Sequence, residues 1–353
     1  MIRRVLTMDS IQRFRAFALT YAVIVAGIDP GRCLAGETES GVARVPLLSD
    51  EEAWKRLPAV LSGGGQPMPS WARALARSLP RTTAAMLDLD RIHRTRSPLG
   101  PLLRGKMRWV AAQANRCEYS IRHAEADLRR AGLDEAGLSS LKGDNRADLP
   151  EPERAALAFA HRMTEDAAEV TDDEVARLIA QHGESKVVAM VLLLAYANFQ
   201  DRILLALGVP IEASGPLPPP EVRFNWKADP PAVPPRQQPT GRPAPKEPER
   251  IDDPFWLSME FDDLQGRLTE QRSRPSRIRV PSWEEALRVM PPEITRPKKP
   301  IRIRWSLVTM GYQPELAAAW SACTRAFGEE ANQDQVFEES LFWIVTRTIH
   351  CFY

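Results

Sequence analysis

The chain has little of what defines several large classes of protein. Only four of its 353 residues are cysteine, which excludes a small domain held together by disulfides. Acidic and basic side chains nearly cancel to a formal net charge of +1, so the overall charge does not indicate a nucleic-acid partner. Aromatic residues make up 7% of the chain, and no alternating apolar pattern of useful length predicts a β-strand. The absence of a strand pattern favours an all-α fold.

Long apolar runs are also scarce. Arginines precede AFALTYAVIVAGI (residues 16–28), and the small residues Cys33 and Ala35 follow it. This order is typical of a secretory signal, although a first helix of the fold fits the same residues. We therefore predict residues 1–35 to be a signal peptide or an N-terminal helix, which leaves export and a cytoplasmic location both open. The run from Val187 to Ala197 is too short to span a membrane and predicts a buried core helix.

Proline is concentrated in one segment near the middle of the chain. Residues 215–250 read GPLPPPEVRFNWKADPPAVPPRQQPTGRPAPKEPER. Such a stretch cannot pair its backbone into regular structure and prefers extended conformations. We therefore predict a linker over residues 213–253, which separates a first module at 44–212 from a second at 254–353. A proline-rich ligand for a partner domain is the alternative.

Helical signals fill the first module. Apolar residues at helical spacing, from Leu103 to Ala114 and from Ile121 to Ala131, predict two helices, and Gly132 is typical of a helix C-terminus. Pro152 suits the start of a third helix, where a missing N–H costs little. Thr171 and Glu174 form a capping box for a fourth, and a long apolar helix follows from Ser185 to Leu207.

The second module repeats the beginning of the first. RVPLLSDEEAWKRLP, from Arg44, is echoed by RVPSWEEALRVMP, from Arg279. Further matches keep an almost constant separation of 233 or 234 residues. They pair Glu51 with Glu284, Trp71 with Trp305, Pro80 with Pro314, Trp109 with Trp343, and Cys117 with Cys351. A constant offset of this length predicts two copies of one helical module, the second lacking its C-terminal part.

The stretch AAQANRCEYSIRHAEADLRRAGL (111–133) places a histidine shortly after a cysteine. This stretch and PERAALAFAHRMT (152–164) resemble the alkylhydroperoxidase D-like proteins of the carboxymuconolactone decarboxylase family, over about residues 44–212 and again about 279–353. The family signature is a glutamate, about a dozen residues, then Cys-x-x-Cys followed by a histidine. The resemblance implies an all-helical and usually oligomeric protein that reduces peroxides or exchanges disulfides, in which the cysteine nearer the histidine attacks.

The first module departs from that signature. Cys117 occupies the first cysteine position, but Ser120 occupies the second and Gly105 stands where the glutamate belongs. His123 is present, while many relatives have histidine at the position of Ala124. A thiol without a resolving partner is more often a small buried hydrophobe than a nucleophile. We therefore expect module one to be inactive in thiol chemistry, with Cys117, Ser120 and His123 as its remaining candidate site residues.

The second module keeps the spacing but stops short. Glu339 lies twelve residues before Cys351, which matches the family. In a complete site of this kind, a thiolate attacks the substrate and a second thiol three residues on resolves the product as a disulfide. A carboxylate and a histidine relay protons. Our hypothesis is that the native product continues past Tyr353 with a cysteine and then a histidine, so that Cys351 and Glu339 belong to the working site.

Three functions follow as alternatives. The leading expectation is peroxidase or thiol–disulfide redox activity on a small peroxide or disulfide, with an unknown thiol donor. The second is a cysteine-independent decarboxylase of small lactones, which a pocket lined by several histidines and arginines would support. The third is a non-catalytic module that packs in an oligomer. We expect no cofactor, no metal site and no nucleic-acid partner. His93, in the basic stretch RIHRTR, is expected in a solvated loop, and Cys323 in the core.

Overall fold

A computed structural model describes residues 43–57, 65–142, 148–224, 260–292, 296, 299–331, 333–349 and 351. These residues contain helices and no β-strand, which confirms the all-α prediction. The predicted signal or first helix at 1–35, and residues 225–253 of the predicted linker, lie outside the described residues.

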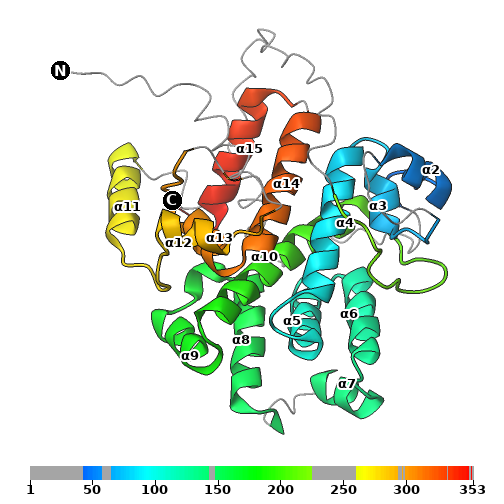
Figure 1. Cartoon of the computed structure of the whole chain (residues 1–353), viewed down its shortest axis with the longest axis horizontal. Helices are drawn as coiled ribbons and strands as arrows, with labels where there is room; N and C mark the ends of the chain where they lie inside the picture. The colour runs from blue at the N-terminus through cyan, green and yellow to red at the C-terminus, as the bar shows by residue number, and fades with distance from the viewer. Residues whose placement is uncertain are drawn as a thin grey trace.

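Fourteen α-helices and one short 3₁₀-helix make up the regular structure of the described part (Figure 1). Their bounds are α2 (Asp50–Arg56), α3 (Ser70–Leu75), α4 (Pro80–Thr95), α5 (Pro101–Ala114), α6 (Glu118–Arg130), α7 (Glu135–Lys142), α8 (Glu151–Glu165), η2 (Ala167–Glu169), α9 (Asp172–His182), α10 (Glu184–Leu207), α11 (Phe261–Ser273), α12 (Trp283–Val289), α13 (Arg304–Tyr312), α14 (Pro314–Glu330) and α15 (Gln335–Thr348).

Local signals place the helix ends of the first module as predicted. Thr171 caps α9 and forms a capping box with Glu174. Pro152 lies in the first turn of α8, where no intrahelical partner is lost. Gly132 follows α6 with φ of +92°, a conformation that disfavours residues with a Cβ. The long apolar helix begins at Glu184, one residue before the predicted Ser185.

The central helix α10 is apolar all round because both of its sides are covered. Val188 and Leu192 pack into one core cluster with α3, α4 and α14, whereas Met190 and Leu194 pack into a second with α5, α6 and α8. Within the described part, α10 is long and apolar enough to cross a membrane, yet 78% of its most apolar window is buried inside the fold. Core helices of soluble proteins pass the same test, so this feature is weak support for a membrane span.

The helices of the second module repeat the order and spacing of the first. α12 begins 233 residues after α2, and α13, α14 and α15 each begin 234 residues after α3, α4 and α5. Capping boxes at Ser49 and Ser282 open the first helix of each set. Pro80 and Pro314 open α4 and α14 after N-cap residues of nearly the same backbone conformation. This agreement supports the predicted tandem repeat.

The two modules meet through equivalent helices. α4 lies against α14 in Figure 1. The pair is antiparallel, because the start of α4 at Arg81 contacts the end of α14 at Glu330, while Arg96 after α4 pairs with Glu315 at the start of α14. Trp320 of α14 reaches the first core cluster beside Tyr196 of α10. The second module therefore supports the helices that shape the first module's interior.

Candidate functional site

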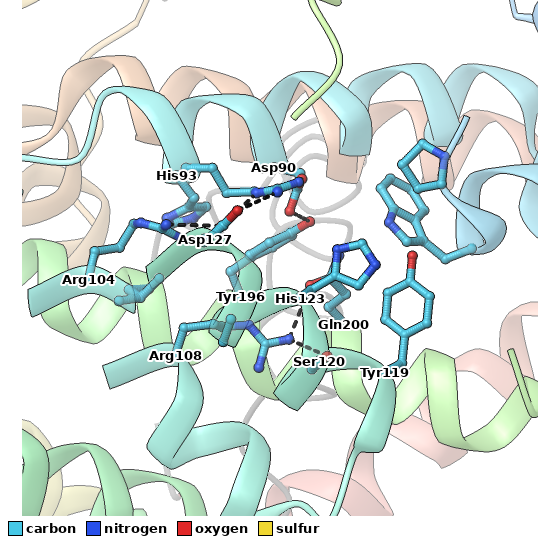
Figure 2. A pocket seen from close by; sticks show the side chains of 15 residues that line it. Asp90, His93, Arg104, Arg108, Tyr119, Ser120, His123, Asp127, Tyr196 and Gln200 are labelled. Carbon is cyan, nitrogen blue, oxygen red and sulfur yellow. Dashed lines mark hydrogen bonds and ion pairs between the residues drawn. The ribbon is translucent and has the colours of Figure 1, made fainter. Parts of the chain in front are cut away.

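A small polar pocket opens in the first module where α4, α5, α6 and α10 meet, next to the start of α3 (Figure 2). Its cavity volume is about 40 Å³, which gives room for a molecule of a few heavy atoms. Seven of the lining side chains are titratable arginines, histidines and aspartates. They are three arginines, two histidines and two aspartates, namely Arg94, Arg104, Arg108, His93, His123, Asp90 and Asp127.

Cys117 lies beside the pocket without lining it. It is the N-cap residue of α6, and only 1% of its surface is exposed. Burial, with a further contribution from the charge of Asp201, raises the pKa of the thiol to about 12. Its Sγ lies 3.5 Å from the Ser120 hydroxyl. The thiol therefore stays protonated at neutral pH and acts as a small buried group, as the sequence predicts.

Ser120 lines the pocket within a buried ion-pair network. Its hydroxyl donates to Asp201 Oδ1 at 2.6 Å and accepts a hydrogen bond from Arg108 Nη2 at 2.7 Å. Arg108 also reaches the second oxygen of Asp201 and the side-chain oxygen of Gln200. Asn115 donates to Asp201 as well. The Ser120 hydroxyl therefore bridges Arg108 and Asp201 by hydrogen bonds. We call this network the Asp201 cluster (Arg108, Asn115, Ser120, Gln200 and Asp201).

His123 lines the pocket and is paired with a buried carboxylate. Its Nε2 lies 2.9 Å from Glu212 Oε2, and its ring stacks on Tyr119 with centroids 4.3 Å apart. The Tyr119 hydroxyl and the Ser70 N–H both donate to the other oxygen of Glu212. Burial alone would raise the pKa of Glu212, but the contacts with His123, Tyr119 and Ser70 lower it below its usual value. Glu212 is therefore an ionised acceptor at neutral pH.

A second group of charges gathers around Asp127, which lies one helical turn after His123 on α6. Three guanidinium groups contact Asp127: Arg94 through two bonds of 2.7 and 2.9 Å, Arg104 at 3.0 Å and Arg130 at 2.8 Å. Arg94 also reaches Asp90 at 3.3 Å. We call these five residues the Asp127 cluster. It holds three positive charges against two negative ones.

The structure corrects the expectation for His93. This residue is 2% exposed, belongs to α4 rather than to a solvated loop, and stacks on Tyr196 at 4.8 Å. Burial, followed by the charges of Arg104 and Arg108, lowers its pKa to about 3. The basic stretch is buried because Arg94 and Arg91 are paired with carboxylates. Neutral His93 is thus part of the pocket wall.

The predicted site residues of the second module lie apart from one another. Glu339 is in the second turn of α15, and Cys351 follows the end of that helix. The nine residues that follow Glu339, up to the end of α15 at Thr348, rise about 14 Å along the helix, so the two side chains start near opposite ends of α15. The backbone N–H of Cys351 bonds to Thr346 as that of Cys117 does to Ala112, which gives both cysteines the same turn. Cys351 is half-buried.

The second module does not repeat the pocket. At an offset of 234, the positions of His93 and Arg94 hold Phe327 and Gly328, and that of Arg108 holds Phe342. Cys323 is buried in the core, as expected. Among the described residues, no group of three or more His, Cys, Asp or Glu side chains could hold a metal ion. The polar pocket is therefore a property of the first module.

Sequence reasoning missed several residues that build this site. Glu212, Asp201 and Asp127 hold His123, Ser120 and the arginines, respectively. Glu212 lies 89 residues from His123 in the chain, so helical spacing could not join them. The available signal was Asp201, which follows the apolar run from Val187 to Ala197 on the same helix, where a charge in an apolar setting requires a partner.

Comparisons with known proteins identify one distant relative. No family model matches the chain. A stretch of 131 residues is 26% identical to the uncharacterised protein YdfG of Bacillus subtilis (strain 168), covering 36% of this chain and 88% of the relative. The relative is thus close in size to a single module. Its own activity is uncharacterised, so the resemblance to the carboxymuconolactone decarboxylase family stays a prediction.

Proposed function

We propose that the first module is a cysteine-independent acid–base enzyme acting on a small carbonyl compound, such as a short keto acid that loses CO₂. One observation carries this proposal: the paired His123 and Glu212 at a small pocket lined by two histidines and three arginines. The nearby thiol of Cys117 supports it further, because the thiol is buried, protonated and outside the pocket lining.

His123 is the residue that transfers the proton. An ionised carboxylate only accepts hydrogen bonds, so Glu212 fixes a hydrogen on His123 Nε2. The other ring nitrogen, Nδ1, is then a base when unprotonated and an acid when protonated. In a decarboxylation the bond to the carboxylate carbon breaks, CO₂ leaves, and the electron pair left on carbon takes the proton from His123. Stacking on Tyr119 holds the ring in place.

Enzyme assays on the full chain test this proposal. A panel of small lactone acids and short keto acids would be incubated with the protein, and substrate loss and CO₂ release followed. His123→Asn should lower kcat by about 100-fold or more, the usual contribution of a general acid or base. Cys117→Ala and Cys351→Ser should leave kcat unchanged. Activity that survives His123→Asn, or that disappears in a folded Cys117→Ala protein, contradicts the proposal.

A packing role for the second module is the second candidate, and it is compatible with the first. Trp320 of α14 contacts the ring of Tyr196, which lines the pocket. The tandem arrangement would hold two family-like units together in one chain, in place of two subunits of an oligomer. Peroxide or disulfide reduction at Cys351 and Glu339 stays a prediction that requires a further thiol and a thiol donor.

A further inference from the structure

Two polar atoms in the pocket wall lack the hydrogen bond that their burial calls for. They are His93 Nε2 and Arg104 Nε, which are fully enclosed and have no hydrogen-bond partner. The residues are 2% and 4% exposed, respectively. Figure 2 shows both on the same side of the pocket, beside Asp127. Buried polar groups are nearly always satisfied, so a neighbouring pair of unsatisfied nitrogens points to a missing acceptor.

The charges around these two atoms define what that acceptor is. Asp127 is shared by three guanidinium groups, of which Arg94 and Arg104 are buried and Arg130 is 40% exposed. Arg104 makes one hydrogen bond to Asp127, whereas Arg94 makes two. Burial lowers the pKa of Arg104, the attraction of Asp127 opposes this without fully offsetting it, and the charge of Arg94 adds to the lowering. An anion beside Arg104 would supply the acceptor that its Nε lacks.

We propose that His93 Nε2 and Arg104 Nε form a binding subsite for the carboxylate group of a small organic acid. Arg104 donates a charge-assisted hydrogen bond from Nε, and neutral His93 donates from the Nε2–H tautomer. The carboxylate supplies the acceptors that both nitrogens lack. This subsite lies beside Asp127, whereas His123 lies one helical turn earlier on α6 and is paired with Glu212. The inference rests on the proposed function only in placing the ligand in the same pocket.

Binding measurements with a charged and a neutral probe test the subsite. Acetate and acetamide have nearly the same shape, and only acetate carries the charge. NMR titration of the full chain should show acetate binding about tenfold or more tightly than acetamide, the usual effect of one hydrogen bond to a charged group. Equal binding of the two probes, or binding of neither, overturns the proposal.

Variants assign the effect to the two residues. His93→Phe keeps a ring to stack on Tyr196, as Phe327 shows at the equivalent repeat position, and removes Nε2. Arg104→Met removes Nε, and Arg104→Lys keeps the charge if the methionine variant fails to fold. Each should weaken acetate binding about tenfold or more. Matched controls at exposed sites are His161→Phe and Arg122→Met. Unchanged acetate binding in folded His93→Phe and Arg104→Lys rejects the subsite.

The same titrations separate this subsite from the proposed enzyme activity. His123→Asn should abolish turnover yet weaken acetate binding less than His93→Phe does, because His123 is paired with Glu212 rather than with the Asp127 cluster. If acetate binding ignores His93 and Arg104 but turnover still requires His123, the subsite fails and the proposed function stands. If acetate binding depends on both residues but no panel compound turns over, the pocket is a carboxylate-binding site and the proposed function fails.

Discussion

Glu330, in the last turn of α14, caps the start of α4 by accepting the backbone N–H groups of Arg81 and Thr82 at 2.7 and 2.8 Å. The 234-residue offset relates this contact to the ion pair between Arg96 and Glu315 at the other end of the two helices. α4 thus presents arginine at both ends, and α14 presents glutamate at both ends. Pairing of two copies of either helix in this register would place like charges together, so the charges favour the mixed pair.

Removal of the Glu330 carboxylate should therefore loosen the contact between the modules. Glu330→Ala leaves two buried N–H groups and the Thr82 hydroxyl without their acceptor. We expect the free energy of unfolding to fall by about 1–3 kcal/mol, as for a lost cap together with a charged hydrogen bond. Urea denaturation measures this change. Glu169→Ala, at an exposed site, is the control, and equal stability of the two variants would show that the cap contributes nothing.

Burial of neutral His93 should make stability depend on pH between about 6.5 and 3. Its pKa is lower in the fold than in the unfolded chain, so the unfolded state binds the proton first as the pH falls. Stability from this residue is complete above the unfolded pKa and declines below it, by about 2 kcal/mol at pH 5. Denaturation curves at pH 7.5 and 5 measure the loss. His93→Phe should flatten this dependence, whereas His161→Phe should retain it.

Thiol labelling should separate Cys351 from the two buried cysteines Cys117 and Cys323. Cys117 and Cys323 are buried, and burial raises both pKa values to about 12, so neither thiol is reactive in the folded protein. Cys351 is half-buried and should react first. Iodoacetamide treatment at pH 8, followed by mass spectrometry of the peptides, gives the order. Both buried cysteines should be modified after unfolding in denaturant. Rapid modification of Cys117 in the native protein would instead indicate that the first module has a reactive thiol.

The helices could be predicted from sequence because their signals are local. Caps such as Thr171 with Glu174, and apolar residues three or four positions apart, report on neighbours within one or two turns. The tandem offset was equally visible, because it depends only on matching residues. These signals predicted the all-α class and the main elements of module one.

The site could be predicted only in part. Ser120 and His123 were identified from their position after Cys117, but their partners Asp201 and Glu212 lie 81 and 89 residues away. Tertiary packing of α10 brings these carboxylates to α6, and no local pattern encodes that contact. The sequence predicts His93 in solvent because arginines surround it. Arg91 and Arg94 are instead paired with carboxylates, so this part of α4 is buried together with His93.

Trp320 should connect the second module to the pocket of the first. It is 3% exposed and lies edge-on to Tyr196, with ring centroids 6.2 Å apart, and beside Phe199 at 6.0 Å. Truncation in Trp320→Ala removes a large buried ring and should lower the free energy of unfolding by about 3–5 kcal/mol. Tyr196 also stacks on His93 and donates to Asp90, so the cavity would reach the pocket wall. Acetate binding should therefore weaken in Trp320→Ala under conditions where the protein remains folded.

Trp54→Ala, at a half-buried site on α2, is the matched control and should leave acetate binding intact. If Trp320→Ala unfolds more easily but binds acetate as the unmodified chain does, the second module stabilises the first without shaping its pocket.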